Sequence, residues 1–265
     1  MDKRKSFPEV LSQIPPGCTL AIGGMTLYRR PVTFVRKLIE YYTQHHTPDG
    51  LILLAFTGGI ECDWLIGAGM INKVRTCYFG LEVFGFAPMF TFYANAGSIE
   101  IIEETEASLA FGLRAQMAGV GFMPGRGWLG TDLPALRPDV KKVVDPYNSE
   151  ELIAFPAIKP DVAIIHALKA DYDGNALIGT NKAVDEELAI TASYVIVTAE
   201  EVLPELPHAD LVAPFVHAVI ATPGGAAPTS CHPLYPINGE TILTYTEQVS
   251  DPDSYRRYLK NWICA

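Results

Sequence analysis

The stretch Thr19-Leu20-Ala21-Ile22-Gly23-Gly24-Met25-Thr26 decides the fold class, because a short apolar run ends there in a glycine turn. A helical pattern follows from Pro31, and proline suits the first turn of a helix, where its missing N–H has no intrahelical partner to lose. The apolar side chains of that helix share one face; they are Phe34, Val35, Leu38 and Ile39. The chain is therefore predicted to begin with a strand, a glycine turn and a covering helix.

The same alternation continues along the chain. The other predicted strands are 51–55, 74–79, 99–102, 163–165 and 194–197, and the other predicted helices are 63–68, 88–96, 106–118 and 182–192. The strands are nearly continuous in apolar residues, which is typical of strands buried on both faces of a parallel sheet. We therefore expect an α/β fold, an open and mainly parallel sheet covered by helices.

The 265 residues are predicted to form one domain, 1–265. Within it, the segment of about 119–139 is rich in Gly and Pro and is long for a connection inside a compact domain. We interpret it as a loop that protrudes or acts as a lid. A last helix is expected over 253–262, and nothing in the sequence decides whether it packs on a partner.

Composition argues against several classes of protein. The hydrophobic share of 49% argues against a disordered chain, and the formal net charge of −10 argues against nucleic-acid binding. No apolar run approaches the roughly 20 residues that cross a bilayer, so we expect a cytoplasmic protein that does not contact membranes. The cysteines are scattered and never paired as C-x-x-C, which favours reduced thiols and no metal site; they are Cys18, Cys62, Cys77, Cys231 and Cys264.

Glycines and acids gather at the carboxyl ends of the predicted strands, where open parallel sheets bind ligands. These segments are Gly23–Thr26, Thr57–Gly59, Gly80–Gly85 and Glu103–Glu106. Glycine lets the backbone approach a ligand closely, and free N–H groups there can bind an anion or a developing oxyanion. The same glycines also fit plain strand-to-helix turns, since the chain has no phosphate-binding signature.

The acidic and histidine candidates also have two interpretations each. Glu82 lies between apolar residues in a turn, where its charge needs a partner. Glu106 opens a predicted helix, and a carboxylate there is favoured by the helix dipole without any function. His166 ends a buried strand, either beside a site or as a hydrogen-bonded core residue. No G-x-S-x-G elbow and no nucleophile–base pair is visible.

Several segments together resemble the alpha subunits of class I coenzyme A-transferases, most closely those of the glutaconate CoA-transferase branch. The segments are Ile22–Thr26 with Arg29–Pro31, Gly80–Pro88, Gly112–Ala115, Phe122–Asp132, His166-Ala167 before Asp173–Asn175, and Pro223–Ser230. They run in the family's order from about residue 10 to about residue 245. Each segment is modest alone, and their order and spacing make the resemblance specific.

The resemblance implies the α/β fold that CoA-transferases share with sugar-phosphate isomerases. It also implies a catalytic unit of alpha and beta subunits, as a heterodimer or heterotetramer. In the family a glutamate of the beta subunit, in a Glu-Asn-Gly or Glu-Ser-Gly motif, attacks an acyl-CoA and passes the CoA to a small carboxylic or dicarboxylic acid. This chain has neither motif. We therefore expect it to be inactive without a beta partner, with coenzyme A as a substrate and no permanently bound cofactor.

The resemblance also implies site residues. The candidates for binding substrate or CoA are Gly23, Gly24, Met25, Thr26, Arg29, Glu82, Arg126, Gly130, Gly224 and Gly225. One of Arg29, Arg30 and Arg126 is expected to hold a substrate carboxylate, because a guanidinium pairs with a carboxylate through two hydrogen bonds. In ring-opening hydrolases of the same branch, a glutamate of the alpha subunit before Gly-Leu is catalytic, and Glu106 falls at that place.

Three functions remain open on the sequence. The first is CoA transfer together with a beta subunit. The second is hydrolysis or decarboxylation of a CoA thioester on the same scaffold, with Glu106 as base or nucleophile. The third is a non-catalytic ligand-binding or regulatory protein, because a fold alone does not determine a function.

Overall fold

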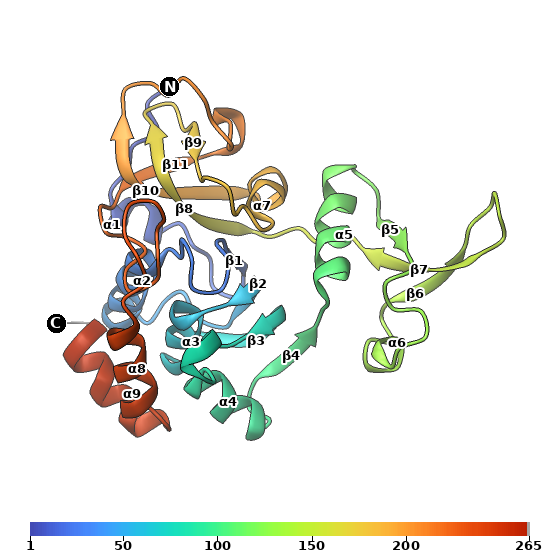
Figure 1. Cartoon of the computed structure of the whole chain (residues 1–265), viewed down its shortest axis with the longest axis horizontal. Helices are drawn as coiled ribbons and strands as arrows, with labels where there is room; N and C mark the ends of the chain where they lie inside the picture. Colours follow the sequence, from blue (N-terminus) through green and yellow to red (C-terminus); the bar gives the residue numbers. More distant parts are fainter. Residues whose placement is uncertain (264–265) are drawn as a thin grey trace.

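A parallel sheet organises the chain in the computed structural model, which describes residues 1–263 (Figure 1). Its strand order is β11-β10-β8-β1-β2-β3-β4, and every neighbouring pair on this path is parallel. The strands are β1 (Thr19–Ile22), β2 (Leu51–Gly58), β3 (Ile71–Phe79), β4 (Glu100–Glu103), β8 (Val162–Asp171), β10 (Tyr194–Leu203) and β11 (Ala218–Ala221). An eighth strand, β9 (Ala176–Leu177), pairs antiparallel with β8. The predicted α/β fold is confirmed.

The order in which the strands are laid down creates a switch point between β1 and β8. The chain runs outward from β1 through β2 and β3 to β4, then returns to the other side of β1 as β8 and continues outward through β10 to β11. Where the connections from two neighbouring parallel strands lead to opposite sides of the sheet, a crevice opens at the carboxyl ends of those strands. The Gly23-Gly24 turn follows β1, and His166 lies on β8.

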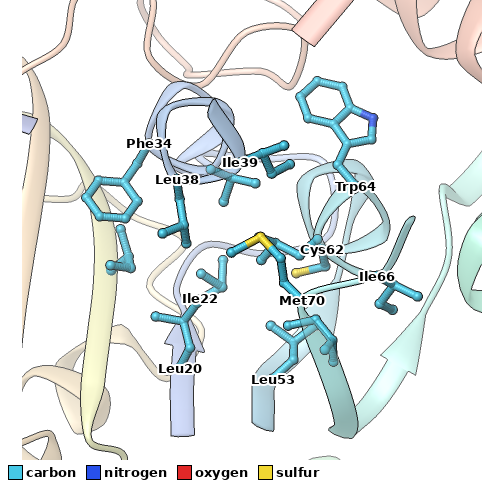
Figure 2. Close-up of a cluster of buried hydrophobic side chains, with 14 of the residues drawn as sticks. Leu20, Ile22, Phe34, Leu38, Ile39, Leu53, Cys62, Trp64, Ile66 and Met70 are labelled. Carbon is cyan, nitrogen blue, oxygen red and sulfur yellow. The ribbon is translucent and has the colours of Figure 1, made fainter. Parts of the chain in front are cut away.

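Helices cover both faces of the sheet and bury two apolar clusters. The larger cluster includes residues from α1 (Phe7–Leu11), α2 (Val32–His45), α3 (Ile60–Gly67), α4 (Pro88–Asn95), α8 (Gly239–Gln248) and α9 (Pro252–Tyr258). Figure 2 shows its centre, where Leu20 and Ile22 of β1 point toward Leu38 of α2. Ala21, between them in sequence, belongs to the cluster under α5 (Glu106–Met117) and α7 (Asp185–Thr191). Because successive strand residues point to opposite faces, β1 is buried on both sides.

The middle of the chain forms a second, smaller sheet. The strand β7 (Glu151–Pro156) pairs antiparallel with both β5 (Phe122–Gly125) and β6 (Lys141–Val144), and α6 (Leu133–Leu136) lies between β5 and β6 in the chain. The expectation of one long loop over 119–139 is therefore wrong, because β5 pairs with distant residues and carries the Pro and Gly that hide a strand in a sequence. In Figure 1 this sheet lies to one side of the main sheet, beyond α5. A lid function remains a prediction.

Two side chains attach the small sheet to the corner between β4 and α5. The Trp128 side chain is fully buried, and its Nε1 donates to Oγ1 of Thr105 at 3.0 Å. The Arg137 guanidinium donates to the carboxylate of Glu104 at 3.0 Å and to the carbonyl oxygen of Glu103 at 2.8 Å. Arg75 of β3 binds the same Glu104 carboxylate. The first residue of α5, Glu106, lies at this corner.

The remaining elements are short. They are the 3₁₀ turns η1 (Glu82–Phe84) and η2 (Ala213–Phe215) and the π-helical turn η3 (Leu259–Ile263) after α9. Cys18, Cys62, Cys77 and Cys231 carry free thiols, and Cys264 lies outside the described residues. Within residues 1–263, none of the helices is both long and apolar enough to cross a membrane. That the whole chain is a single domain remains a prediction.

Gly112 on α5 generates a testable prediction about packing. A Cβ at Gly112 would lie 2.4 Å from Cδ1 of Ile158 and 2.9 Å from the carbonyl oxygen of Pro156. We expect Gly112→Ala to lower the free energy of unfolding by about 1–3 kcal/mol, because overpacking outweighs the better helix propensity of alanine. Chemical denaturation measures the difference. Gly121→Ala is the matched control, since nothing lies within 4 Å of its Cβ position. Equal stability of the two variants would contradict the prediction.

Candidate functional site

Two glycine turns meet at the edge of the main sheet where its parallel strands end. The first, Gly23-Gly24, follows β1, and the second, Gly224-Gly225, follows β11. Main-chain hydrogen bonds join the segments that carry them: Arg29 N to Ser230 O at 2.7 Å, Ser230 N to Leu27 O at 2.9 Å and Thr33 N to Gly225 O at 2.9 Å. The fold thus brings together two turns that lie about two hundred residues apart in the chain and that the sequence flagged separately.

The amides of the first turn already have partners. The N–H groups of Gly23, Gly24, Met25 and Thr26 donate, respectively, to Ile164 O at 2.9 Å, the Asp185 carboxylate at 3.0 Å, Tyr28 O at 3.0 Å and Thr57 Oγ1 at 2.7 Å. The expectation of free amides that cradle an oxyanion is therefore wrong for these four residues in this chain. Their part in binding a substrate in some other way remains a prediction.

Close packing explains both glycines of the first turn. A Cβ at Gly23 would lie 2.7 Å from Oδ1 of Asp185. Gly24 has a φ of +86°, and a Cβ there would lie 2.6 Å from the carbonyl oxygen of Arg29. Only glycine fits the second position without strain. These residues are therefore required by the turn itself, whatever lies against it.

Arg29 and Arg30 are buried and paired, so they do not offer a free guanidinium to a substrate. Arg29 Nη2 lies 2.7 Å from the Asp185 carboxylate, and the same side chain donates to the carbonyl oxygen of His166 at 2.7 Å. Arg30 Nε donates to Glu61 at 2.7 Å. Both arginine side chains have no exposed surface. The expectation that one of them holds a substrate carboxylate is corrected: each already neutralises a buried carboxylate, whose charge needs a partner away from water.

A second polar group lies under the Gly224-Gly225 turn. His166 Nε2 and Glu200 Oε1 are 2.8 Å apart, and His166 Nδ1 and Thr198 Oγ1 are also 2.8 Å apart. The Gly224 N–H donates to Glu200 Oε2 at 2.6 Å, and the Tyr235 hydroxyl donates to Glu200 Oε1. Glu200 therefore joins β8, β10 and the loop after β11.

The protonation states of this group follow from burial and hydrogen bonding. Burial lowers the pKa of His166, so the ring is neutral at pH 7. Burial acts to raise the pKa of Glu200, but hydrogen bonds from His166, Tyr235 and the Gly224 N–H outweigh it and lower that pKa to about 2. A carboxylate beside a neutral ring assigns the proton to His166 Nε2, which donates to Glu200, while Nδ1 accepts from Thr198.

The same place holds a set of metal-ligand atoms. The ligand atoms of His166, Glu200 and Cys231 all lie within 4.8 Å of one another. Burial raises the pKa of the Cys231 thiol to about 11, so the thiol is protonated in the metal-free protein. Because Glu200 already accepts from His166, Tyr235 and the Gly224 N–H, a hydrogen-bond network accounts for the cluster.

The two acids predicted as site residues, Glu106 and Glu82, follow other strands of the main sheet, β4 and β3. Glu106 is exposed in the first turn of α5, and its charge adds to burial in raising the pKa of the Cys77 thiol at the end of β3 to about 11. Glu82 is exposed in η1 with a φ of 55°, in a turn where the side chains of Val83 and Phe86 are 92% and 80% exposed.

Arg126 and Gly130 belong to the small sheet and its connections, which Figure 1 shows apart from the switch point. The Arg126 side chain is exposed and pairs with Glu150. Of the three candidate arginines, Arg126 is therefore the one with an exposed guanidinium. The predicted site residues thus lie in three places: the two joined glycine turns, the exposed positions of Glu82 and Glu106, and the small sheet with its connections.

Sequence reasoning missed Asp185, Thr198, Glu200 and Tyr235. The one available signal is the spacing of Thr198 and Glu200, since residues two apart on a strand point to the same face. Their partner His166 lies on another strand, and nothing local in the sequence indicates that pairing.

Comparison with known proteins identifies the family. A sequence model described as coenzyme A transferase matches residues 4–219. The chain belongs to the coenzyme A transferase family. The chain is 31% identical to the A subunit of 3-oxoadipate CoA-transferase from Pseudomonas knackmussii, over 93% of this chain and 88% of that protein. It is 28% identical to the cholesterol ring-cleaving hydrolase IpdA subunit of Mycobacterium tuberculosis, over 99% of this chain and 93% of that protein.

Other proteins are similar over most of this chain. An uncharacterised protein of Archaeoglobus fulgidus is 31% identical over 99% of this chain, and the chain spans 59% of that protein's length. A variant of the AibA/AibB decarboxylase superposes with a TM-score of 0.87 at 28% identity, covering 98% of this chain and 100% of that one. Glutaconate CoA-transferase of Acidaminococcus fermentans superposes with a TM-score of 0.90 at 24% identity, covering 99% and 89%, which shows the shared transferase fold.

The arginines of this transferase-family chain give a second prediction. We expect Arg29→Met to lower the free energy of unfolding by about 3–5 kcal/mol, because it leaves the Asp185 carboxylate buried without its partner. The matched control is Arg126→Met, which removes an exposed ion pair and is expected to cost about 0–1 kcal/mol. Denaturant titration of both variants measures the difference. A small effect for Arg29→Met would show that Asp185 does not depend on this pair.

Proposed function

We propose that this chain is the alpha-type subunit of a two-subunit CoA-transferase, which moves CoA between an acyl-CoA and a small carboxylic or dicarboxylic acid. The observation that carries the proposal is the state of the carboxylates at the switch point. Asp185 and Glu61 are buried in ion pairs with arginines, and Glu200 accepts hydrogen bonds from three donors. None of these three is free to attack a thioester, which supports a nucleophile supplied by another subunit.

The chemistry assigned to the complex is covalent transfer through a glutamate of the beta subunit. Its carboxylate attacks the thioester carbonyl, which forms an acyl anhydride and releases the CoA thiolate. The thiolate then attacks the glutamyl carbonyl, which gives a glutamyl-CoA thioester and the free acid. The acceptor carboxylate reverses these two steps. Coenzyme A is a substrate throughout, and no resident cofactor takes part.

Trapping the glutamyl thioester tests this proposal. The chain is co-expressed with a beta-type subunit, incubated with a panel of acyl-CoAs, treated with borohydride and analysed by mass spectrometry. We expect a reduced glutamate on the beta chain and no turnover by this chain alone, because its own switch-point carboxylates are engaged. An adduct on this chain, or turnover in the absence of the beta subunit, would overturn the proposal. Binding of acyl-CoA without any turnover would favour a non-catalytic role.

A hydrolase is the second candidate, and the placement of Glu106 favours it. The Glu106 side chain is exposed beside the carboxyl ends of β3 and β4, where a base or nucleophile reaches a ligand. The hydrolase subunit of Mycobacterium tuberculosis is similar over 99% of this chain. Under this alternative, Glu106→Gln abolishes hydrolysis of an acyl-CoA by the complex, as followed by mass spectrometry of the products. Under the transferase proposal, Glu106→Gln retains the borohydride-trapped adduct on the beta chain.

The turn at Glu82 gives a prediction about the partner. Val83 and Phe86 project apolar side chains into solvent just after β3, on the same edge of the sheet as the glycine turns, and we assign them to the contact with the beta subunit. We expect the double substitution Val83→Asp with Phe86→Asp to weaken the complex by more than about tenfold in Kd, because it buries unpaired charges. Analytical ultracentrifugation measures the Kd. Val212→Asp, at another exposed apolar position, is the control, and an unchanged Kd for the double variant would refute the assignment.

A further inference from the structure

A continuous chain of polar contacts connects the two glycine turns across the switch point. From the first turn, the Gly24 N–H donates to Asp185, which pairs with Arg29, and Arg29 donates to the carbonyl oxygen of His166. The ring of the same histidine contacts Glu200, and Glu200 accepts a hydrogen bond from the Gly224 N–H of the second turn. The two turns are therefore coupled through buried side chains as well as through main-chain bonds.

Glu200 occupies the critical place in this chain of contacts. Its side chain is 9% exposed, and its partners come from three separate segments: His166 on β8, Gly224 in the second turn and Tyr235 beyond it. The Tyr235 hydroxyl in turn accepts the N–H of Ala226 at 3.0 Å. One carboxylate thus holds the second turn directly through Gly224 and indirectly through Tyr235.

The second turn needs such an anchor. Gly224 has a φ of +69°, it is exposed, and no atom lies within 4 Å of its Cβ position. Gly225 rests against the histidine ring, since a Cβ there would lie 2.7 Å from Cε1 of His166. Glycine pairs lose more conformational freedom on ordering than other residues do. Without the carboxylate, Gly224 loses its hydrogen bond while its exposed face remains unpacked.

We propose that Glu200 is a positioning residue, whose carboxylate fixes the Gly224-Gly225 turn relative to the Gly23-Gly24 turn and so preorganises the edge on which an acyl-CoA thioester lies. This inference rests on the proposed CoA-transferase function. The carboxylate acts through the turn and does not touch the reacting atoms. A turn held in its bound conformation binds the thioester without a further loss of entropy on binding.

A metal ion at His166, Glu200 and Cys231 is the competing explanation of the same cluster. An ion would have to displace the hydrogen bonds that Tyr235 and the Gly224 N–H make to Glu200, and it would have to deprotonate a buried thiol. The network is complete without one. The hydrogen-bond interpretation is therefore favoured, and metal content is one arm of the test.

The experiment uses the complex of this chain with its beta subunit and the variant Glu200→Gln. Glutamine keeps the size of the side chain, but its amide group cannot accept the hydrogen bonds of both Gly224 and Tyr235. We expect KM for the acyl-CoA to rise about tenfold while kcat changes less than about threefold, because the loss falls on preorganisation for binding. Tyr235→Phe keeps the carboxylate and removes one of its donors, so a smaller rise in KM is expected.

The control variant is Glu201→Gln on the same strand, where Glu201 makes an exposed ion pair with Lys169. It is expected to leave both kinetic constants unchanged. A lower melting temperature for Glu200→Gln with an unaltered KM would reduce Glu200 to a purely structural role and overturn the proposal. Stoichiometric zinc in the wild-type complex by elemental analysis, lost in Cys231→Ser, would overturn it in favour of a metal site.

Hydrogen exchange separates this inference from the proposed function. Whether or not the wild-type complex turns over acyl-CoA, we expect amide exchange at Gly224 and Ala226 to accelerate at least about tenfold in Glu200→Gln, because both anchors loosen. Exchange at the Gly23-Gly24 turn is the internal reference, because the amides of that turn donate to Ile164 and Asp185 and not to Glu200. Unchanged exchange at Gly224 would overturn the positioning role even if the complex proves to be a transferase. Accelerated exchange in a complex without transferase activity would uphold the anchoring and refute the function.

Discussion

The buried ion pair between Arg29 and Asp185 is the interaction on which the rest of the site depends. A buried pair of charges is favourable only when the remaining donors and acceptors are satisfied, because both ions lose their hydration. Here Asp185 also accepts the N–H of Gly24, and Arg29 also donates to the carbonyl oxygens of His166 and Asn181, which leaves Arg29 Nε as the one donor of that guanidinium that is buried without a hydrogen-bond partner among the described residues. The pair therefore connects the turn after β1, the start of α7 and the middle of β8, the three segments that meet where the strand order reverses.

The acidic side chains near the switch point fall into two groups, those that are paired within the chain and those that are exposed. The carboxylates closest to the switch point neutralise arginines or hold the second glycine turn, while the acids at Glu82 and Glu106 remain exposed at its margins. Of the described carboxylates at this edge, Asp185, Glu61 and Glu200 are thus all engaged by other groups of the chain. Under the CoA-transferase function proposed above, a carboxylate from a second subunit supplies the covalent chemistry, and the position of this edge sets how a bound thioester is aligned with it.

The elements of the main sheet follow from the sequence because the forces that set them are local. Apolar runs such as 19–22 and 163–165 are found as buried strands, and the helix predicted from Pro31 is found as Val32–His45. The site was harder to predict because its defining contacts are not local. Arg29 and Arg30 carry the chemistry of substrate-binding residues, and only the fold reveals that Asp185 and Glu61 already occupy them. The same is true of β5, whose Pro and Gly indicate a loop until its pairing with β7 is known.

The corner between β4 and α5 shows how neighbouring acids can take opposite roles. Glu104 is buried, bound by Arg75 and Arg137, and it accepts the hydroxyl of Ser108, so it attaches the small sheet to the main one. Glu106, two residues further, points into solvent at the start of a helix whose first turn Thr105 caps. The fixed Glu104 makes the position of Glu106 well defined without engaging its carboxylate. The corner therefore combines a buried acid that attaches the small sheet with an exposed acid at the start of a helix, and the exposed acid is the one that the hydrolase alternative proposed above uses.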